Sequence, residues 1–449
     1  MIIDLHPDAS KNFDNKANAL LLELTSAPKT LYNMAECTSK PDIFVSAHLS
    51  EKDVIGEVES SQVDGFGNEV SKYFDAGDVL IGLKEDSYLK LKRLAEDMQR
   101  TKALTDRVSI TFLIKNIFDW MRKKYKNCIS LSMSEFVLKR CEEEINEFEV
   151  WIPVAQLHIN SEIKLGKIMF KTITRDLIDS WSAAYKSKNP AHIVNIERYF
   201  DEKRKKIQGY ATATIKLCAE PNRAWEIARE ESEKAISLLR VFSPACFIPQ
   251  AVSYCTMYGQ QNIQSKLYLT FANGQRPAIV EGFSSPEVKL WQLDNALFTQ
   301  IMPCLILLDG VLIKENKTPF QDTSLDALSL YSKSSLFKTI EDKLIYILIA
   351  LEYMLLKNEN ESIMQNIGER IAFFITTNSV ERKRIVERTK TIYSLRSKFI
   401  HHGQNIDDIQ KLQDFMFDAW RFFQNLILNI NRFNTKEEFI TKIEEVKFS

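Results

Sequence analysis

The segment Leu344–Leu356 constrains the fold more than any other part of this sequence. It reads LIYILIALEYMLL, so the helix that it predicts carries apolar residues on every face. Such a helix has to be buried among other helices, which predicts a helical bundle in this part of the chain. Its only charged residue is Glu352, and a buried carboxylate is expected to pair with a cation. The nearest candidates in the sequence are Arg370 and Arg396.

A second helix is predicted from Ser379 to His401. Asn378 and Glu381 are spaced as in the capping box that begins a helix. Apolar residues recur at helical spacing and mark one face of it: Ile385, Ile392, Leu395 and Phe399. At about 100° per residue, Arg396 falls in the middle of that face. An arginine in this position is costly unless it is paired or faces a polar partner.

The residues around this arginine form a recognisable pattern. Arg396 is followed, after four intervening positions, by His401, which resembles the R-x4-6-H signature of HEPN-domain ribonucleases. The longer pattern resembles the Apea-like HEPN family, in which an A-L-E helix precedes Y-x-x-R-S-x-x-x-H-G. The matching residues are Ala350, Leu351, Glu352, Tyr393, Arg396, Ser397, His401 and, one place late, Gly403. The resemblance covers about the last third of the chain.

The resemblance implies a metal-independent endoribonuclease that needs no cofactor and leaves 2′,3′-cyclic phosphate and 5′-hydroxyl ends. RNA supplies its own nucleophile, a histidine can transfer protons near neutral pH, and an arginine offers fixed donors to phosphate oxygens. The candidate catalytic residues are Arg396, His401, His402, Ser397 and Glu352. The resemblance also implies a cytoplasmic bacterial defence protein, whose N-terminal region senses a phage or stress trigger and licenses cleavage.

Helix geometry limits how these groups can meet. On a straight helix, His401 lies ~140° and His402 ~240° around the axis from Arg396. Either the last turn unwinds toward Gly403, which suits a C-cap, or a second chain completes the site. In the HEPN ribonucleases that this motif resembles, two motifs face each other in a dimer. The resemblance therefore predicts a homodimer or a higher even-numbered oligomer. His401 is favoured because it has the family spacing and shares a face with Ser397; His402, beside the glycine, is the alternative.

A cluster of basic residues near the motif could bind the substrate, although the whole chain is nearly neutral. Between Val380 and Gly403, seven basic residues stand against Glu381 and Glu387, while the whole chain has a net charge of −1. Apart from Arg396, these are the predicted RNA-binding residues: Arg382, Lys383, Arg384, Arg388, Lys390 and Lys398. Such a stripe can hold phosphates of a tRNA or another cellular RNA. The alternative for each single residue is a solvated helix face.

Composition indicates a globular chain of two or three domains, with 449 residues and 45% hydrophobic content. The seven cysteines are scattered without a C-x-x-C pair, which favours reduced thiols in a cytosol over a zinc site or a disulfide framework. The first residues lack the apolar core of a signal peptide. The longest apolar runs, interrupted by Glu352 or Asp309, are expected to be too short to span a bilayer, so no membrane partner is predicted.

The predicted fold class is an α+β N-terminal part followed by an all-α HEPN helical bundle. Three regions are predicted: a mixed α/β sensor region (1–145), an α+β domain (146–285) and a helical HEPN domain (286–449). In the second region, two β-rich runs are expected to form a hairpin at Asn160–Ser161. In the third, a long apolar helix from Val288 to Ile313 should be kinked or split by Pro303.

Two alternatives accompany this interpretation. Glu162 and Lys164 form the E-x-K pattern that closes the metal site of many restriction-type nucleases. That chemistry needs an aspartate nearby, and the nearest upstream is Asp119 on a predicted helix, so exposed strand charges are favoured. The other alternative is non-enzymatic: the HEPN bundle binds RNA or a partner, and the chain is a sensor or scaffold. The intact pair of Arg396 and His401 favours the enzyme.

Overall fold

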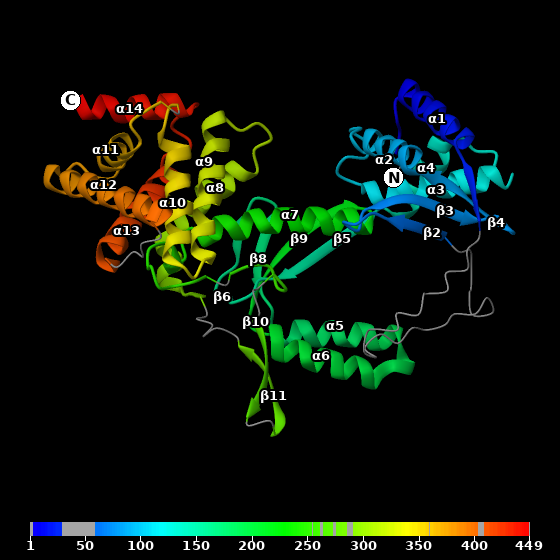
Figure 1. The fold of residues 1–449 in the computed structure, drawn as a ribbon, viewed down its shortest axis with the longest axis horizontal. Coiled ribbons are helices and arrows are strands. Elements are labelled where there is room, and N and C mark those ends of the chain that lie inside the picture. Colours follow the sequence, from blue (N-terminus) through cyan, green and yellow to red (C-terminus); the bar gives the residue numbers. More distant parts are fainter. Residues whose placement is uncertain are drawn as a thin grey trace. The chain divides into compact units, whose positions relative to one another are not determined.

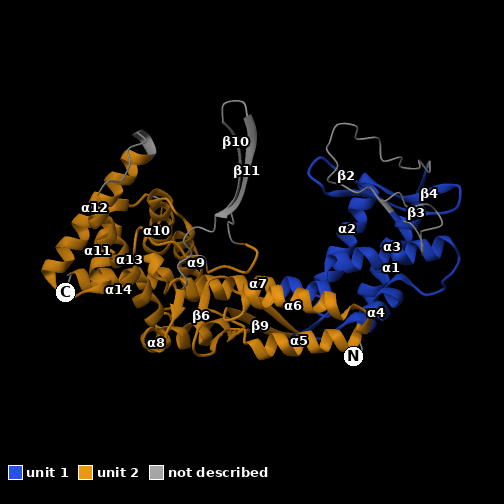
Figure 2. Cartoon of the chain, turned by 90° about the horizontal axis from the view of Figure 1, so that it is seen from below, with its two compact units in different colours: residues 1–148, 217–227 blue, residues 149–216, 228–449 orange. Residues whose placement is uncertain are grey.

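The structure, a computed structural model, describes residues 3–28, 59–253, 255–260, 264–272, 275–284, 291–358, 360–402 and 408–448. The chain divides into two compact units (Figure 2). Unit 1 consists of Met1–Phe148 and Leu217–Ile227, and unit 2 of Glu149–Lys216 and Ala228–Ser449. The predicted order, sheets and helices first and a helical C-terminal part after them, is confirmed (Figure 1). The regions 146–285 and 286–449, predicted as separate domains, lie largely in unit 2.

Unit 1 is built on a four-stranded antiparallel sheet with the order β1-β4-β3-β2. Its strands are β1 (Thr25–Pro28), β2 (Glu59–Val63), β3 (Glu69–Asp75) and β4 (Val79–Lys84). Its helices are α1 (Pro7–Leu22), α2 (Glu85–Gln99), α3 (Ile110–Tyr125) and α4 (Met133–Glu144). A Cβ atom at Gly82 would collide with the backbone of Tyr73, its partner across the sheet, so glycine is needed there. Phe74, Phe118 and Trp120 lie buried in the core of this unit.

A second four-stranded sheet has the order β5-β9-β8-β7. Its strands are β5 (Asn146–Pro153), β7 (Ile163–Leu165), β8 (Ile168–Thr172) and β9 (Ala211–Ala219). The predicted hairpin at Asn160–Ser161 is wrong, because the turn lies at Gly166, between β7 and β8. Gly166 has φ +63°, a backbone conformation that glycine adopts readily. The preceding strand β6 (Leu157–Ile159) pairs instead in parallel with β12 (Trp291–Leu293).

Two hairpins and a long helix complete this part of the chain. Helices α5 (Arg175–Lys188) and α6 (Ile193–Ile207) form a helical hairpin around a small core that includes Ile178 and Phe200. Strands β10 (Gln264–Ala272) and β11 (Gln275–Ser284) pair with each other alone (Figure 1). Helix α7 spans Pro221–Arg240.

The C-terminal helices of unit 2 are α8 (Asn295–Leu312), α9 (Pro319–Lys333), α10 (Ile340–Leu355), α11 (Ile363–Ile375), α12 (Ser379–His402), α13 (Ile409–Leu428) and α14 (Lys436–Phe448). Helix α13 contacts α8, α11 and α12, so it lies inside the bundle. Its ring of Phe423 stacks on Tyr331 of α9 with centroids 4.2 Å apart. Short connections between most of these helices agree with the predicted bundle.

Helix α8 departs from the prediction in two ways. It begins at Asn295 rather than Val288, because Asp294 caps it by accepting a hydrogen bond from the Leu297 amide at 2.8 Å. It is one helix that contains Pro303, so the expected split is wrong, while the alternative of a kink stays a prediction. By length and composition alone, α8 could cross a membrane, contrary to the expectation for the apolar runs, and only 28% of its residues are buried.

Candidate functional site

Helix α12 carries the motif and forms as the sequence predicts. The Asn378 side chain accepts hydrogen bonds from the amides of Val380 (2.9 Å) and Glu381 (3.0 Å), which satisfies the open N-terminus of the helix. On the predicted apolar face, Ile385 and Ile392 are fully buried. The helix continues through His402 without unwinding, so the described residues do not show the turn that would unite Arg396 with a histidine of the same chain.

Arg396 lies half-buried on the inner side of α12. Its Nε atom is buried and has no hydrogen-bond partner within the part of the chain that the structure describes. A buried donor without an acceptor is costly, and such groups are few in native structures. Arg396 therefore has at least one donor left for an acceptor from outside the described residues.

Glu352 interacts with a residue other than the predicted arginines. Its Oε1 atom accepts a hydrogen bond from the Tyr393 hydroxyl at 2.9 Å, which joins α10 to α12. Burial, and then the charge of Glu352, raise the pKa of the Tyr393 hydroxyl well above its ordinary value, so this hydroxyl remains a donor. Glu352 itself is half-buried rather than fully buried. The predicted ion pair of Glu352 with Arg370 or Arg396 is thus replaced by a bond to a neutral hydroxyl.

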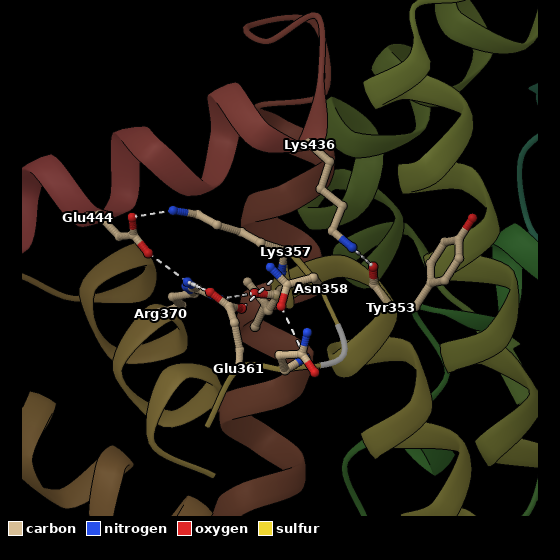
Figure 3. A network of polar contacts seen from close by, with 9 residues as sticks. Tyr353, Lys357, Asn358, Glu361, Arg370, Lys436 and Glu444 are labelled. Atoms are coloured by element: carbon tan, nitrogen blue, oxygen red, sulfur yellow. Dashed lines mark hydrogen bonds and ion pairs between the residues drawn. The ribbon is translucent and has the colours of Figure 1, made fainter. Parts of the chain in front are cut away.

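Arg370 is occupied elsewhere (Figure 3). It donates to both carboxylate oxygens of Glu361, at 2.7 and 2.8 Å, and to Glu444 at 2.6 Å. It also donates to the Leu355 carbonyl at the end of α10. Hydrogen bonds from Arg370 lower the pKa of Glu361 to about 2. Lys357 holds the other oxygen of Glu444 at 2.7 Å. The network ties α10, α11 and α14 together, and it explains why Arg370 does not reach Glu352.

Two of the predicted RNA-binding residues are used within the fold. The Arg382 guanidinium lies 4.1 Å from the ring centroid of Phe373 and donates to the Thr376 carbonyl at 2.8 Å. Arg388 pairs with Asp418 at 2.6 Å and with Asp414 at 3.5 Å. These contacts hold α12 against α11 and α13, so the two arginines act as packing residues here.

The other predicted RNA-binding residues remain on the surface: Lys383, Arg384, Lys390 and Lys398 are exposed. Glu381 does not neutralise them, because its carboxylate pairs with Arg421 of α13 at 2.6 Å. Ser397 is exposed as well. Lys383, Lys390 and Ser397 follow one another at intervals of seven residues, which places them along one side of the helix. We call this side, with Lys398, the basic face of α12.

The histidines can be placed only by their position in the helix. The side chains of residues 400–402, and residues 403–407 entirely, lie outside the described part of the chain. Since α12 is regular to its end, position 401 falls on the basic face, four residues after Ser397, and ~140° from Arg396. The preference for His401 over His402 therefore remains a prediction, as does any role for Gly403.

A further buried cation was missed by sequence reasoning. Lys343, one residue before the apolar run, is fully buried in α10. Its ammonium donates to the carbonyls of Ala245, at 3.2 Å, and Ala251. Burial lowers the pKa of Lys343 to about 8. Its spacing of four residues from Ile347, on the inner face of the helix, was the signal that could have revealed it.

Lys164 of the E-x-K pattern and Asp119 each have other partners. Lys164 lies 3.6 Å from Asp309 of α8, and Asp309 also accepts a hydrogen bond from the Gly166 amide at 2.8 Å. Asp119 pairs with Arg122 and Lys123 on its own helix. Glu162 is exposed. Among the described residues, no group of three or more histidine, cysteine or acidic side chains lies close enough to hold a metal ion.

No protein-family model, curated protein or solved structure matches this chain. The motif residues and their geometry therefore carry the functional argument by themselves.

Proposed function

We propose that this chain is a metal-independent endoribonuclease of the HEPN type, with its site at the C-terminal end of α12. The observation that carries the proposal is the Arg396 guanidinium, whose buried Nε has no described partner, on a helix whose opposite side is basic and exposed. A phosphate is an acceptor suited to such a group.

The proposed reaction is a transesterification within the RNA. His401, or His402 as the alternative, takes the proton of the ribose 2′-hydroxyl, and the 2′-oxygen attacks the adjacent phosphorus. Arg396 stabilises the charge on the equatorial oxygens of the phosphorane. The 5′-oxygen leaves with a proton delivered by a protonated histidine of a second copy of the chain, which gives a 2′,3′-cyclic phosphate and a 5′-hydroxyl. Ser397 lies beside position 401 as a polar neighbour, and Glu352 orients α12 through Tyr393.

A second copy of the chain would complete the site. Because α12 stays helical through His402, one chain keeps Arg396 and position 401 on different sides. A two-fold axis beside Phe399–Gly403 would bring the arginine of one chain to the histidine of another. The exposed residues Lys383, Arg384, Lys390 and Lys398 would then form a phosphate track on each chain. In this proposal the protein is a cytoplasmic defence nuclease, and its N-terminal region (1–145) senses its trigger.

A second candidate is favoured by the half-buried state of Arg396. If the guanidinium serves only to hold the bundle together, the chain is an RNA- or partner-binding scaffold without catalysis. Both candidates use the basic face, but only the first produces new RNA ends.

The deciding experiment compares cells that express wild type, Arg396→Ala and Arg432→Ala. Arg432 is an exposed arginine of the same unit and serves as the matched control. Sequencing of 5′-hydroxyl RNA ends should show new cleavage sites with wild type and Arg432→Ala and none with Arg396→Ala. Equal RNA ends in all three strains, with the folded protein present, would reject the nuclease and leave the scaffold.

A further inference from the structure

Helix α8 exposes an apolar side that none of the described residues covers. Ile306 and Ile313 are 63% and 57% exposed, although isoleucine is among the residues most often buried. The two isoleucines continue a row along one side of the helix, which we call the α8 seam: Ala296, Thr299, Pro303, Ile306, Gly310 and Ile313. A Cβ atom placed on Gly310 would meet no other atom within 4 Å, so the space beside the seam is open.

The seam carries no charge. Within α8 the only charged residue is Asp309, which is held by the Gly166 amide at 2.8 Å and by Lys164 at 3.6 Å. Steps of three and four residues separate the seam positions, and this spacing repeats every seven residues. A row of this kind is the side on which one helix packs along another over its whole length, here ~26 Å.

The order of small and large residues along the seam is self-complementary. When α8 is laid antiparallel on a copy of itself, with the two-fold axis between positions 303 and 306, Ile306 faces Pro303 and Ile313 faces Ala296. The remaining pair is Thr299 and Gly310. Each isoleucine thus meets a smaller residue, and the same register sets the half-buried Met302 opposite Leu307 beside the seam. A parallel arrangement would set Ile306 against Ile306 and glycine against glycine.

We propose that the α8 seam is a contact between two copies of this chain, which pair antiparallel about a two-fold axis. An isologous interface of this kind needs one surface that complements itself, and the seam meets that condition. In the antiparallel arrangement the two helix dipoles point in opposite directions, so the positive end of each helix lies near the negative end of the other. The proposal does not rest on RNA cleavage, and it concerns a helix other than the one that bears the motif. If copies also pair through the proposed two-fold contact beside Phe399–Gly403, the assembly would contain more than two chains.

Register-specific crosslinking tests the geometry. In a background with Cys37 and Cys128 replaced by serine, Thr299→Cys and Gly310→Cys are made as two separate proteins. Mixed and oxidised, they should form the disulfide-linked heterodimer, because positions 299 and 310 face each other. Thr299→Cys alone should crosslink poorly, since its two cysteines would lie ~16 Å apart along the axis. Equal crosslinking of Thr299→Cys with itself and with Gly310→Cys would overturn the register.

The mass in solution tests the contact itself. Ile306→Lys places a charge in the seam and should halve the mass measured by light scattering. Val194→Lys is the matched control, because Val194 is 78% exposed on α6 of the same unit and should leave the mass unchanged. A wild type with the same mass as Ile306→Lys would overturn the proposal. If that wild type sediments with phosphatidylcholine vesicles and Ile306→Lys does not, the seam binds a bilayer instead, as the apolar character of α8 also allows.

Discussion

The Tyr393 hydroxyl donates a hydrogen bond to Glu352 at 2.9 Å and so connects α12 to α10 one turn before Arg396. This bond holds α12 together with the contacts of Arg382 and Arg388, and so helps to position Arg396. It replaces the ion pair that the sequence suggested for Glu352, and it changes what a substitution should cost. A carboxylate bonded to a hydroxyl leaves no buried cation behind when it is removed.

Tyr393→Phe should lower the free energy of unfolding by about 1–3 kcal/mol, because it leaves the half-buried Glu352 without its donor. Glu352→Gln is the control, since its amide oxygen can still accept the hydrogen bond, and it should cost less. Chemical denaturation of the three proteins measures the difference. If Tyr393→Phe unfolds like wild type, the bond does not contribute to stability.

Glu361 should give the bundle an acid-sensitive stability. Hydrogen bonds from Arg370 hold its folded pKa at about 2, below the ordinary value of 4.5. A depressed pKa means that the unfolded chain binds the proton more readily, so this stabilisation is complete above pH 4.5 and is lost as the pH falls toward 2. Glu361→Gln should flatten this part of the stability profile relative to wild type. Parallel profiles of the two proteins between pH 5 and pH 2 would contradict the assignment.

Lys343 should also make stability rise with pH, but in an alkaline range. Burial lowers its folded pKa to about 8, against an ordinary value of 10.5. Below pH 8 both states carry the proton, and between 8 and 10.5 the unfolded chain holds it more readily. Raising the pH through this range therefore stabilises the folded chain. The difference in unfolding free energy between wild type and Lys343→Met should grow in favour of wild type over this range, and a constant difference would show that Lys343 keeps its ordinary pKa.

The proposed chemistry predicts how cleavage responds to substitution and to chelation. Arg396→Ala and His401→Ala should each abolish RNA cleavage without unfolding the chain, while EDTA should leave the wild-type rate unchanged. Full activity in a folded His401→Ala protein would transfer the role to His402. Activity lost on chelation and restored by magnesium would instead point back to a metal-dependent site.

The basic residues of α12 should separate into two groups. RNA binding should weaken, with stability unchanged, in Lys383→Gln, Lys390→Gln and Lys398→Gln. Each change should reduce, by ~0.7, the steepness with which the logarithm of the RNA association constant falls with the logarithm of the salt concentration. Arg388→Gln should instead lower stability, because the buried Asp418 loses its nearer cation and keeps only Arg421, at 3.9 Å. Filter binding at several salt concentrations, together with thermal melts, distinguishes the two groups. Equal loss of binding in all four variants, without loss of stability, would place Arg388 in the RNA-binding surface.

A mixture of mutant chains tests whether the nuclease site is shared. If Arg396 of one chain works with His401 of another, Arg396→Ala and His401→Ala should together regain part of the activity that neither has alone. Ile306→Lys, which disrupts pairing at the α8 seam, is the control. It separates an effect of the seam contact from an effect of the shared nuclease site. A mixture as inactive as its components would favour sites that lie within single chains.

The sequence by itself determined the features that depend on neighbours along the chain. The order of sheets before helices, the limits of α12 and its cap at Asn378 follow from periodicity and short-range hydrogen bonds. The burial of Ile385 and Ile392 follows in the same way. These features are local, because the geometry of one helix fixes which of its own residues share a side.

The tertiary structure decided which charged groups meet. Arg370 pairs with Glu361 and Glu444 because α14 packs beside α11. Arg388 pairs with Asp418 because α13 packs beside α12. A side chain of several ångströms can pair with any helix that lies within its reach, and the sequence does not state which helices pack together. The α8 seam depends on the sequence and on the tertiary structure. Its spacing can be read from the sequence, but its exposure is set by how the other helices pack.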